Sequence, residues 1–448
     1  MSRFFGFLTV FTLGAAAVYA CGYGARCAPA GSDEFAQQAA ALRAEGPSGL
    51  DVALRRLEEA KSEEERSQLS KLVDQVAGQR DATASRLYWY TDLDLAKRAA
   101  AESGRPILSL RMLGKLTDEY SCANSRYFRT ALYANKEVSD TLRDSFIFHW
   151  QSVRPVPRVT VDFGNGRKLE RTITGNSAHY ILDAAGEPLD ALPGLYGPRV
   201  FHEWLVRSRD FADRYAERTT DASRLSALKE YHLHRQLVVE EQLRADLAAV
   251  APELLNDPNA ASPAEATVMA DGRLTPTAMQ AARRAVSKSL AEVRLVAPFA
   301  PSGETLQAKD DAFWRQIASL HVADAKLDDA SRALVAREFP GRPIPPAAPA
   351  AGKLSVSKGR VEDPLLRLIG NFQEAMAIDG VKNEYTLHRT IHGWFADGTP
   401  PFDVTALNER VYAELFLTPS SDPWLGLAAG DVYTALDNGG LTTPQAAK

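Results

Sequence analysis

The sequence predicts an α+β domain with a mixed central sheet flanked by helices, set between an N-terminal helical segment and an all-helical C-terminal region. Two observations support this prediction. Residues 85–218 alternate helical periodicity with short apolar runs of strand length, whereas the residues on both sides show helical periodicity alone. The chain also has 448 residues, which is too long for one domain of ordinary size.

The composition is that of a soluble globular protein. Hydrophobic residues make up 45% of the chain and charged residues 24%. The net charge of −5, without any block of Lys and Arg, argues against a nucleic-acid-binding surface. We therefore expect no nucleic-acid partner.

The first 20 residues have the pattern of a secretory signal peptide. A positive start at Arg3 precedes an apolar stretch from Phe4 to Ala20. That run is slightly short for a stable transmembrane helix, which needs about 20 apolar residues. The sequence Val-Tyr-Ala-Cys that ends at Cys21 also resembles a bacterial lipobox, in which the cysteine is lipidated after cleavage. Lipidation at Cys21, simple cleavage and an uncleaved anchor stay open. Each places the remainder outside the cytoplasm, in the periplasm or anchored to the membrane.

Residues 21–34 are predicted to be a flexible tether that carries Cys27. The chain has only three cysteines, so a fold held together by several disulfides is excluded. The helical segment predicted over residues 35–84 has apolar residues at helical spacing among many charged ones. Two sets each share a helix face: Leu50, Leu54 and Leu57, and Leu69, Leu72 and Val73. This pattern favours a small helical hairpin packed on the next domain over a coiled-coil site for a partner.

Residues 85–218 are predicted to carry the sheet. A helix over residues 92–103 ends at Gly104, a residue favoured just beyond helix C-termini. Asn165-Gly166 is a strong signal for a hairpin turn, and Pro198 suits the first turn of the last helix. The predicted strands cover 106–112, 145–150, 159–163, 167–174, 178–183 and 188–192, and the other helices begin at Cys122, Glu137 and Pro198.

This order of helices and strands is that of the thioredoxin-like fold. The run Arg105-Pro106-Ile107-Leu108, followed by Cys122 and then Glu137-Val138, resembles bacterial thioredoxin-like domains with the pattern KPILL, CxxC and EV. The stretches 153–157, 162–166, 175–176 and 190–196 resemble a secreted bacterial thioredoxin-like family without an established biochemical role. The resemblance covers roughly residues 85–215, and it implies a thioredoxin-like domain.

The resemblance gives Cys122 the position of the nucleophile and Ser125 that of the resolving cysteine. A thiol at a helix N-terminus is stabilised as the thiolate. A hydroxyl can donate a hydrogen bond to that thiolate but cannot close a disulfide. A dithiol cycle within the motif is therefore lost, whereas a monothiol mechanism through mixed disulfides remains possible.

A second departure concerns the loop before the strand at 178–183. Redox-active members of the fold keep a cis-proline there, which faces the cysteine and contacts the substrate. This chain has Asn176-Ser177-Ala178-His179 instead, and a cis bond without proline costs about 2.5–4 kcal/mol. Such a loop can place His179 or Ser177 near Cys122, and a histidine would favour the thiolate. A reactive Cys122 and a buried, inert Cys122 both stay open.

The C-terminal region is predicted to be one all-α domain in two parts, 219–339 and 361–448. A Pro/Ala-rich linker over 340–360 joins them. Near the end, Trp424 follows Pro423, and we expect this side chain to fill the helical core rather than contact a partner. Helical periodicity runs through 225–255, 276–293, 305–321, 327–338, 364–395 and 404–417.

Glu384, His388 and His392 follow each other at a spacing of four residues and so share one helix face. The two histidines can bind a metal ion if a third ligand is present. No Glu follows His388, so the H-E-x-x-H motif is absent, and interleaved apolar residues favour a core-facing helix. His232 and His234 are two residues apart and point in different directions. We therefore expect no metal and no cofactor, and a metal-dependent hydrolase is the weakest interpretation.

The sequence thus predicts an extracytoplasmic thioredoxin-fold protein without a dithiol redox centre, acting as a binding or scaffold protein of the cell envelope. The alternative is a monothiol exchange protein in which Cys122 reacts, with Ser125 and His179 tuning it. The expected partner is a protein client or a small thiol, with membrane attachment through a lipid on Cys21. Whether the protein is an enzyme stays open.

Overall fold

The computed structural model describes residues 30–255, 278–288, 295, 308–339, 364–398, 403–427 and 435–436. The predicted signal peptide, the lipidation site at Cys21 and the predicted linker over 340–360 lie outside these residues. The first helix begins at Ala30, so the tether predicted to reach residue 34 ends earlier than expected. Within the described ranges, no helix is both long enough and apolar enough to cross a membrane.

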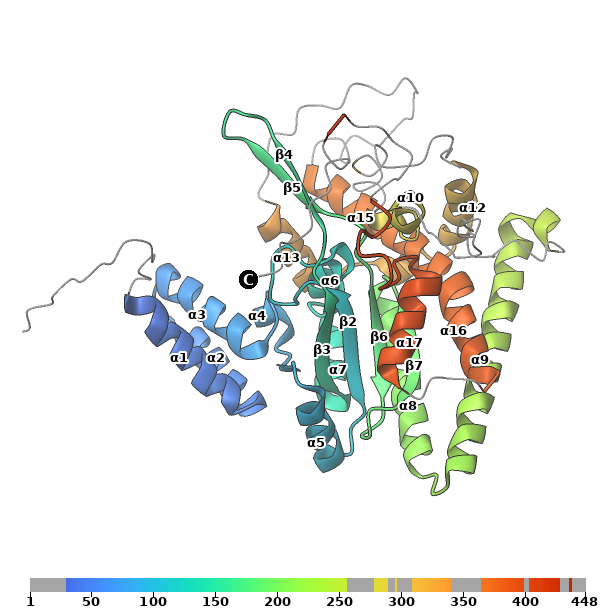
Figure 1. Ribbon diagram of the computed structural model, residues 1–448, viewed down its shortest axis with the longest axis horizontal. Helices are drawn as coiled ribbons and strands as arrows, with labels where there is room; N and C mark the ends of the chain where they lie inside the picture. The colour runs from blue at the N-terminus through green and yellow to red at the C-terminus, as the bar shows by residue number, and fades with distance from the viewer. Residues whose placement is uncertain are drawn as a thin grey trace, which may run out of the picture.

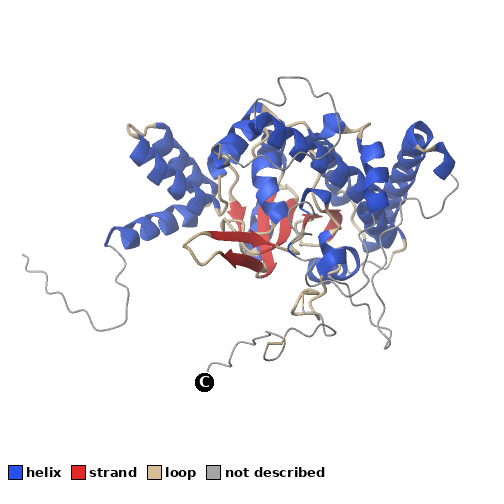
Figure 2. Ribbon diagram, turned by 90° about the horizontal axis from the view of Figure 1, so that it is seen from above, coloured by secondary structure: helices blue, strands red, loops and turns tan. Residues whose placement is uncertain are grey.

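The fold is mixed α/β, built on a five-stranded sheet with many helices around it (Figures 1 and 2). The strand order is β1-β3-β2-β6-β7. The pairs β1–β3 and β2–β3 are parallel, whereas β2–β6 and β6–β7 are antiparallel. This confirms the predicted mixed sheet. Its strands are β1 (Trp89–Tyr90), β2 (Ile107–Leu113), β3 (Ile147–Arg154), β6 (Ser177–Leu182) and β7 (Pro188–Pro193).

The predicted hairpin forms a separate two-stranded sheet that projects from the body of the molecule (Figure 1). Its strands are β4 (Arg158–Asp162) and β5 (Lys168–Thr172). Gly164 and Gly166 have φ values of 71° and 83°, a region that favours glycine and lets the turn close. The hairpin that the Asn165-Gly166 turn signal predicted is therefore confirmed.

Helices flank the main sheet where periodicity predicted them. They are α5 (Leu93–Ser103), α6 (Ala123–Tyr127), the π-helical turn η1 (Phe128–Leu132), α7 (Lys136–Ser145) and α8 (Pro198–Ala216). Gly104 ends α5 in the left-handed conformation, with φ of 66°, as expected. Helix α7 extends through Ser145, so β3 begins at Ile147 rather than at 145.

The N-terminal segment forms a helical unit at one side of the sheet (Figure 1). It contains α1 (Ala30–Ala44), α2 (Pro47–Glu58), α3 (Glu63–Ala77) and the short α4 (Ala82–Ser85), and so is larger than the predicted hairpin. Leu50, Leu54, Leu72 and Val73 are buried in a core of its own, as their spacing predicted. The Arg43 guanidinium donates hydrogen bonds to backbone carbonyls of α3 and β1, which anchors this unit to the sheet.

The described parts of the C-terminal region contain helices and connecting turns, with no strand among them. The longest helix, α9, packs along α16, so the two predicted parts of the region lie together. The elements are α9 (Asp221–Val250), η2 (Pro252–Leu254), α10 (Ala278–Ala282), α12 (Ala308–Ala318), η4 (Val322–Ala325), α13 (Asp329–Glu338), α15 (Pro364–Lys382), η5 (Asn383–His388), α16 (Arg389–Ala396), α17 (Val404–Arg410) and η6 (Val411–Leu415).

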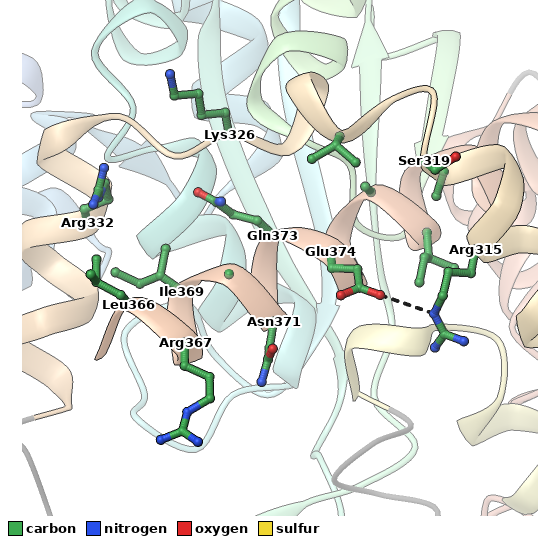
Figure 3. A pocket seen from close by; sticks show the side chains of 15 residues that line it. Arg315, Ser319, Lys326, Arg332, Leu366, Arg367, Ile369, Asn371, Gln373 and Glu374 are labelled. Carbon is green, nitrogen blue, oxygen red and sulfur yellow. Dashed lines mark hydrogen bonds and ion pairs between the residues drawn. The ribbon is translucent and has the colours of Figure 1, made fainter. Parts of the chain in front are cut away.

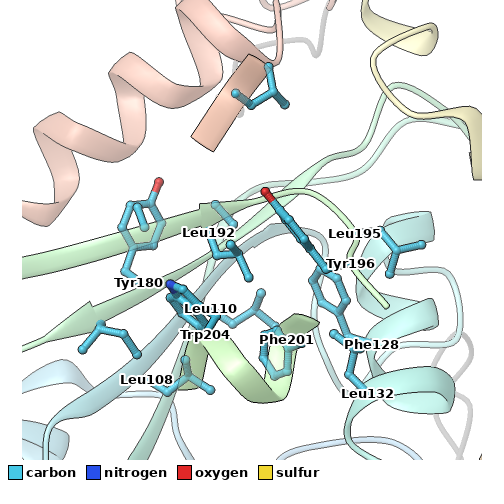
Figure 4. Close-up of a cluster of buried hydrophobic side chains, with 14 of the residues drawn as sticks. Leu108, Leu110, Phe128, Leu132, Tyr180, Leu192, Leu195, Tyr196, Phe201 and Trp204 are labelled. Atoms are coloured by element: carbon cyan, nitrogen blue, oxygen red, sulfur yellow. The ribbon is translucent and has the colours of Figure 1, made fainter. Parts of the chain in front are cut away.

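One hydrophobic core joins the sheet to these helices. Its side chains come from the strands, from α8 and from the C-terminal helices, and Figure 4 shows Leu110, Tyr180, Phe201 and Trp204 among them. The cluster runs across the predicted boundary between residues 218 and 219. Side chains from both predicted domains thus share this core, and the division into a sheet domain and a helical domain stays a prediction.

The two faces of the sheet are covered by different parts of the chain. Alternate residues of a strand point to opposite faces. On β6, His179 packs against rings of η1 and α8, whereas the Tyr180 hydroxyl donates a hydrogen bond to the Asn408 side chain of α17 at 3.1 Å. Helix α17 thus covers the face opposite α8, which helps to explain why β2, β6 and β7 are buried along their whole length.

The prediction for Trp424 is wrong. Its side chain is 37% exposed, whereas the next residue, Leu425, is buried. The Asp422 carboxylate accepts hydrogen bonds from the backbone N–H groups of Trp424 and Gly426, which closes a tight turn. That turn directs Leu425 inward and leaves the indole at the surface.

Candidate functional site

The first candidate site is the thiol of Cys122. The backbone N–H of this residue donates to the Leu113 carbonyl at 3.2 Å, which places Cys122 at the end of β2 as the N-cap of α6. Register pairs Met112 with Ser177 of β6, so β6 begins beside the thiol. The Sγ atom lies 2.9 Å from Ser177 Oγ and 3.4 Å from Ser125 Oγ. Cys122 and Ser125 are therefore brought together as the motif predicted.

The loop that precedes β6 approaches this cysteine closely. A Cβ atom at Gly175 would come within 2.4 Å of the Cys122 Cβ, a distance that real Cβ atoms do not reach. Only glycine therefore permits this approach. The next carbonyl, of Asn176, lies 3.8 Å from Sγ. No peptide bond among the described residues is cis, so this loop forms without the cis bond of redox-active thioredoxin-like domains.

Two side chains from the helical region hold this loop from the other side. The Tyr412 hydroxyl donates to the Asn176 carbonyl at 2.8 Å, and the Lys288 ammonium donates to the Gly175 carbonyl at 2.9 Å. Both side chains are buried. Burial, reinforced by the neighbouring Cys122, raises the pKa of Tyr412 well above its usual value, so the phenol stays protonated as a donor.

A buried carboxylate positions the lysine. Asp379 of α15 accepts hydrogen bonds from the Ser287 backbone N–H at 3.0 Å and from the Ser287 hydroxyl. These bonds fix the short helical segment that carries Lys288. Cys122, the one cysteine among the described residues, is a free thiol with no exposed surface. The thiol is therefore enclosed by α6, β6 and side chains of the helical region.

His179 is not part of this site, and the predicted Cys–His pair is absent. Its Nε2 atom lies 2.6 Å from the Tyr133 hydroxyl, and its ring packs against Phe128 and Phe201. Burial lowers the pKa of His179 to about 3, so the imidazole is neutral. The reason is geometric: His179 shares a sheet face with Ser177 but lies two residues, roughly 6.6 Å, farther along the strand.

A second group of polar side chains is buried between β7, α9 and α16. His388 lies at its edge, with Nδ1 2.8 Å from Glu384 and Nε2 3.4 Å from Asp190. Burial alone would lower the pKa of His388, but the charges of Glu384 and Asp190 outweigh it and raise this pKa to about 9. His388 and Glu384 therefore form a buried ion pair at neutral pH.

Asp190 lies at the centre of this group. Its Oδ2 atom accepts hydrogen bonds from the Trp204 indole at 3.0 Å and the Tyr231 hydroxyl at 3.3 Å. Burial favours the neutral acid, but the hydrogen bond and charge of His388 outweigh it and hold the pKa of Asp190 well below its usual range. The group thus contains a carboxylate that is fully buried and ionised.

His232 and His392 complete the group. Their Nδ1 atoms are 2.8 Å apart, and His232 Nε2 lies 2.9 Å from the Leu189 carbonyl. Burial lowers the pKa of His232 to about 4, and burial together with the charge of His388 holds the pKa of His392 well below its usual value. Both rings are therefore neutral. The Nε2 atom of His392 has no hydrogen-bond partner among the described residues.

This arrangement differs from the predicted one. The sequence pointed to Glu384, His388 and His392 as metal candidates, but the first two are committed to each other as an ion pair. In the part of the chain that the structure describes, the ligand atoms of Asp190, His232 and His392 all lie within 4.8 Å of one another. Sequence analysis missed Asp190 and dismissed His232, because 160 residues separate His232 from His392 and no motif spans them.

A third feature is a surface groove of about 670 Å³ between α12, η4, α13 and α15 (Figure 3). Four cationic side chains line it: Arg315, Lys326, Arg332 and Arg367. Arg315 pairs with Glu374 at 3.2 Å, whereas the other three cations have no ion pair within the described residues. The groove therefore has a net positive charge.

Comparison of the chain with protein-family models, with curated proteins and with solved structures found no match.

Proposed function

We propose that this protein is an extracytoplasmic binding or scaffold protein built on a thioredoxin-like domain that performs no dithiol redox chemistry. The strand order β1-β3-β2-β6-β7, with its parallel and antiparallel pairs, supports the thioredoxin-like assignment. The apolar N-terminus and the lipobox-like sequence at Cys21 support export and a lipid anchor. The observation that carries the functional proposal is the complete burial of Cys122.

Thiol–disulfide exchange requires a thiolate that the other sulfur can reach. In this chain Tyr412 and Lys288 donate hydrogen bonds to the carbonyls of the loop before β6. In a redox-active member of the fold, this loop contacts the substrate. Ser125 also cannot resolve a mixed disulfide. The helical region therefore takes the place of a substrate, and the sheet domain serves as a scaffold.

A binding role requires an accessible surface, and the groove of Figure 3 supplies one. Lys326, Arg332 and Arg367 have no ion pair among the described residues and so present positive charge to an anion, and the exposed side chain of Leu366 adds apolar surface beside them. Charge complementarity favours an acidic segment of a protein client over a small thiol. The client would bind away from Cys122, which leaves the buried thiol without a role in recognition.

The test is alkylation of Cys122 in the full-length protein. Native protein is treated with iodoacetamide across a range of pH, digested, and the Cys122 peptide is quantified by mass spectrometry. We expect no labelling until the protein is denatured, because the thiol is enclosed. Native labelling with a transition near pH 7 or below, where activated thiols titrate at roughly 3.5–7.5, would instead support the monothiol alternative.

A further inference from the structure

We propose that Asp190, His232 and His392 form a binding site for one divalent transition-metal ion of the zinc class. Their ligand atoms lie within 4.8 Å of one another, and all three side chains are buried. The proposal goes beyond the scaffold function, because it assigns a ligand to a different part of the molecule.

The hydrogen bond of His232 prepares one of its nitrogens for a metal. Its Nε2 lies 2.9 Å from the Leu189 carbonyl, which accepts only, so Nε2 carries the proton. In the neutral ring that metal ligation requires, Nδ1 then has a free lone pair, and this atom lies 2.8 Å from His392 Nδ1. Orientation of a ligand histidine by a backbone carbonyl is the usual outer-shell arrangement in metal sites.

His392 is left with an unsatisfied atom when no metal is bound. To face the lone pair of His232 at 2.8 Å, its Nδ1 must carry the proton, and Nε2 then has a lone pair without a partner. If the proton moves to Nε2 instead, two lone pairs face each other. Buried polar atoms are rarely left unpaired. A cation bound by the Nδ1 atoms of both rings would replace the hydrogen bond between them with two coordinate bonds, and His392 Nε2 would then carry the proton.

Asp190 supplies the negative charge that a divalent ion requires. Trp204 and Tyr231 donate to its Oδ2, its Oδ1 accepts from the Ala191 backbone N–H at 2.8 Å, and His388 Nε2 lies 3.4 Å from the same Oδ1. These donors fix the orientation of the carboxylate, as outer-shell residues do for metal ligands. His388 and Glu384 neutralise each other beside the site and are not required as ligands.

Two imidazoles and one carboxylate favour zinc and its first-row neighbours over calcium or magnesium, which take mainly oxygen ligands. The three ligands come from β7, α9 and α16. A bound ion would therefore join the sheet to two helices, α9, which precedes residue 339 in the chain, and α16, which follows residue 364.

The experiment uses the full-length protein, stripped with a chelator and then titrated with Co²⁺, whose visible absorption reports its coordination. We expect saturation at a single ion per chain and displacement by Zn²⁺. His232→Ala and His392→Ala should weaken Co²⁺ binding more than about 100-fold, because each removes a direct ligand. The matched control is His234→Ala, an exposed histidine two residues from His232 on the same helix, which should bind as the wild type does.

Circular dichroism checks that each variant is folded. If the alanine variants do not fold, X-ray absorption spectroscopy of the Zn²⁺-loaded wild type decides alone, since it detects imidazole ligands directly. Two imidazoles and oxygen in the coordination sphere support the site. Failure of the folded wild type to bind Co²⁺ or Zn²⁺, equal binding by wild type and folded His232→Ala, or coordination without imidazole would overturn it. The group would then be a metal-free hydrogen-bond network.

Discussion

The phenol of Tyr412 donates a hydrogen bond to the backbone carbonyl of Asn176, and the same carbonyl lies 3.8 Å from the sulfur of Cys122. Residues 236 positions apart are thereby joined beside the thiol. The contact makes the accessibility of Cys122 depend on the docking of the C-terminal helices.

Tyr412→Phe should make Cys122 easier to alkylate in the native protein. The change removes one hydroxyl and leaves the buried Asn176 carbonyl without its donor, which costs about 1–3 kcal/mol. A loss of about 1.4 kcal/mol would raise labelling through local opening about tenfold. The matched control is Tyr90→Phe on the edge strand β1. Equal labelling of Tyr412→Phe and wild type would show that this contact does not close the site.

Ser125→Cys creates a CxxC pattern but should give no disulfide reductase activity. The new thiol would replace a hydroxyl 3.4 Å from Sγ, yet both residues at this site are buried. Reductase activity needs a substrate disulfide to reach the sulfur. Insulin reduction is the measurement, with a dithiol thioredoxin as the positive control. Activity above background would mean that the helical cover opens in solution.

Gly175→Ala should destabilise the protein, whereas Gly370→Ala should not. The first places a Cβ atom 2.4 Å from the Cys122 Cβ, and such overpacking typically costs about 1–3 kcal/mol. The second places a Cβ in open space on α15, where alanine is favoured over glycine by about 1 kcal/mol. Denaturant unfolding of both variants measures the difference. A Gly175→Ala variant as stable as wild type would contradict the close approach of the loop.

His321 should make stability depend on pH on the alkaline side. Hydrogen bonds that the His321 ring donates to the Asp246 and Asp324 carboxylates raise the pKa of His321 to about 9, above its usual 6.5. Because the folded pKa is the higher one, this stabilisation is complete below about pH 6.5 and is lost as pH rises through 9. We expect a contribution on the order of 1 kcal/mol after solvent screening. Unfolding of His321→Gln and wild type between pH 6 and 10 measures it, and parallel curves would contradict the prediction.

Reversing charge in the groove of Figure 3 should abolish binding of an acidic probe. A labelled oligoglutamate peptide is expected to bind the wild type weakly, with affinity that falls as salt rises, because the pairs are exposed. The double variant Arg332→Glu, Arg367→Glu should lose this binding. Arg98→Glu, on the exposed side of α5, makes a charge change away from the groove and serves as control. Equal loss in the control variant would indicate nonspecific attraction.

The features that sequence analysis predicted correctly depend on neighbours along the chain. Gly104 ends α5, and Asn165-Gly166 lies in the turn of the hairpin, because helix ends and tight turns are decided by a few adjacent residues. The strand after residue 105 and the position of Cys122 at its end followed from the same local patterns.

The parts of the candidate sites that sequence analysis missed depend on contacts between distant segments. His232 and His392 are 160 residues apart, and Lys288 reaches Gly175 across 113 residues. No local pattern encodes such pairs, since they form only when the helices pack on the sheet. The error for His179 has a similar origin: its sequence position allowed contact with Cys122, but the strand register directs it to Tyr133.

The shared core also has a consequence for how the protein is made. Synthesis delivers the N-terminal residues first, and contacts between distant residues form slowly. The face of the sheet that carries Tyr180 is covered only after Asn408, which follows it by 228 residues, has been synthesised. A nascent chain or truncated product that stops before residue 404 therefore presents a wide apolar surface. Such a product would aggregate or bind chaperones rather than fold as a smaller, independent domain.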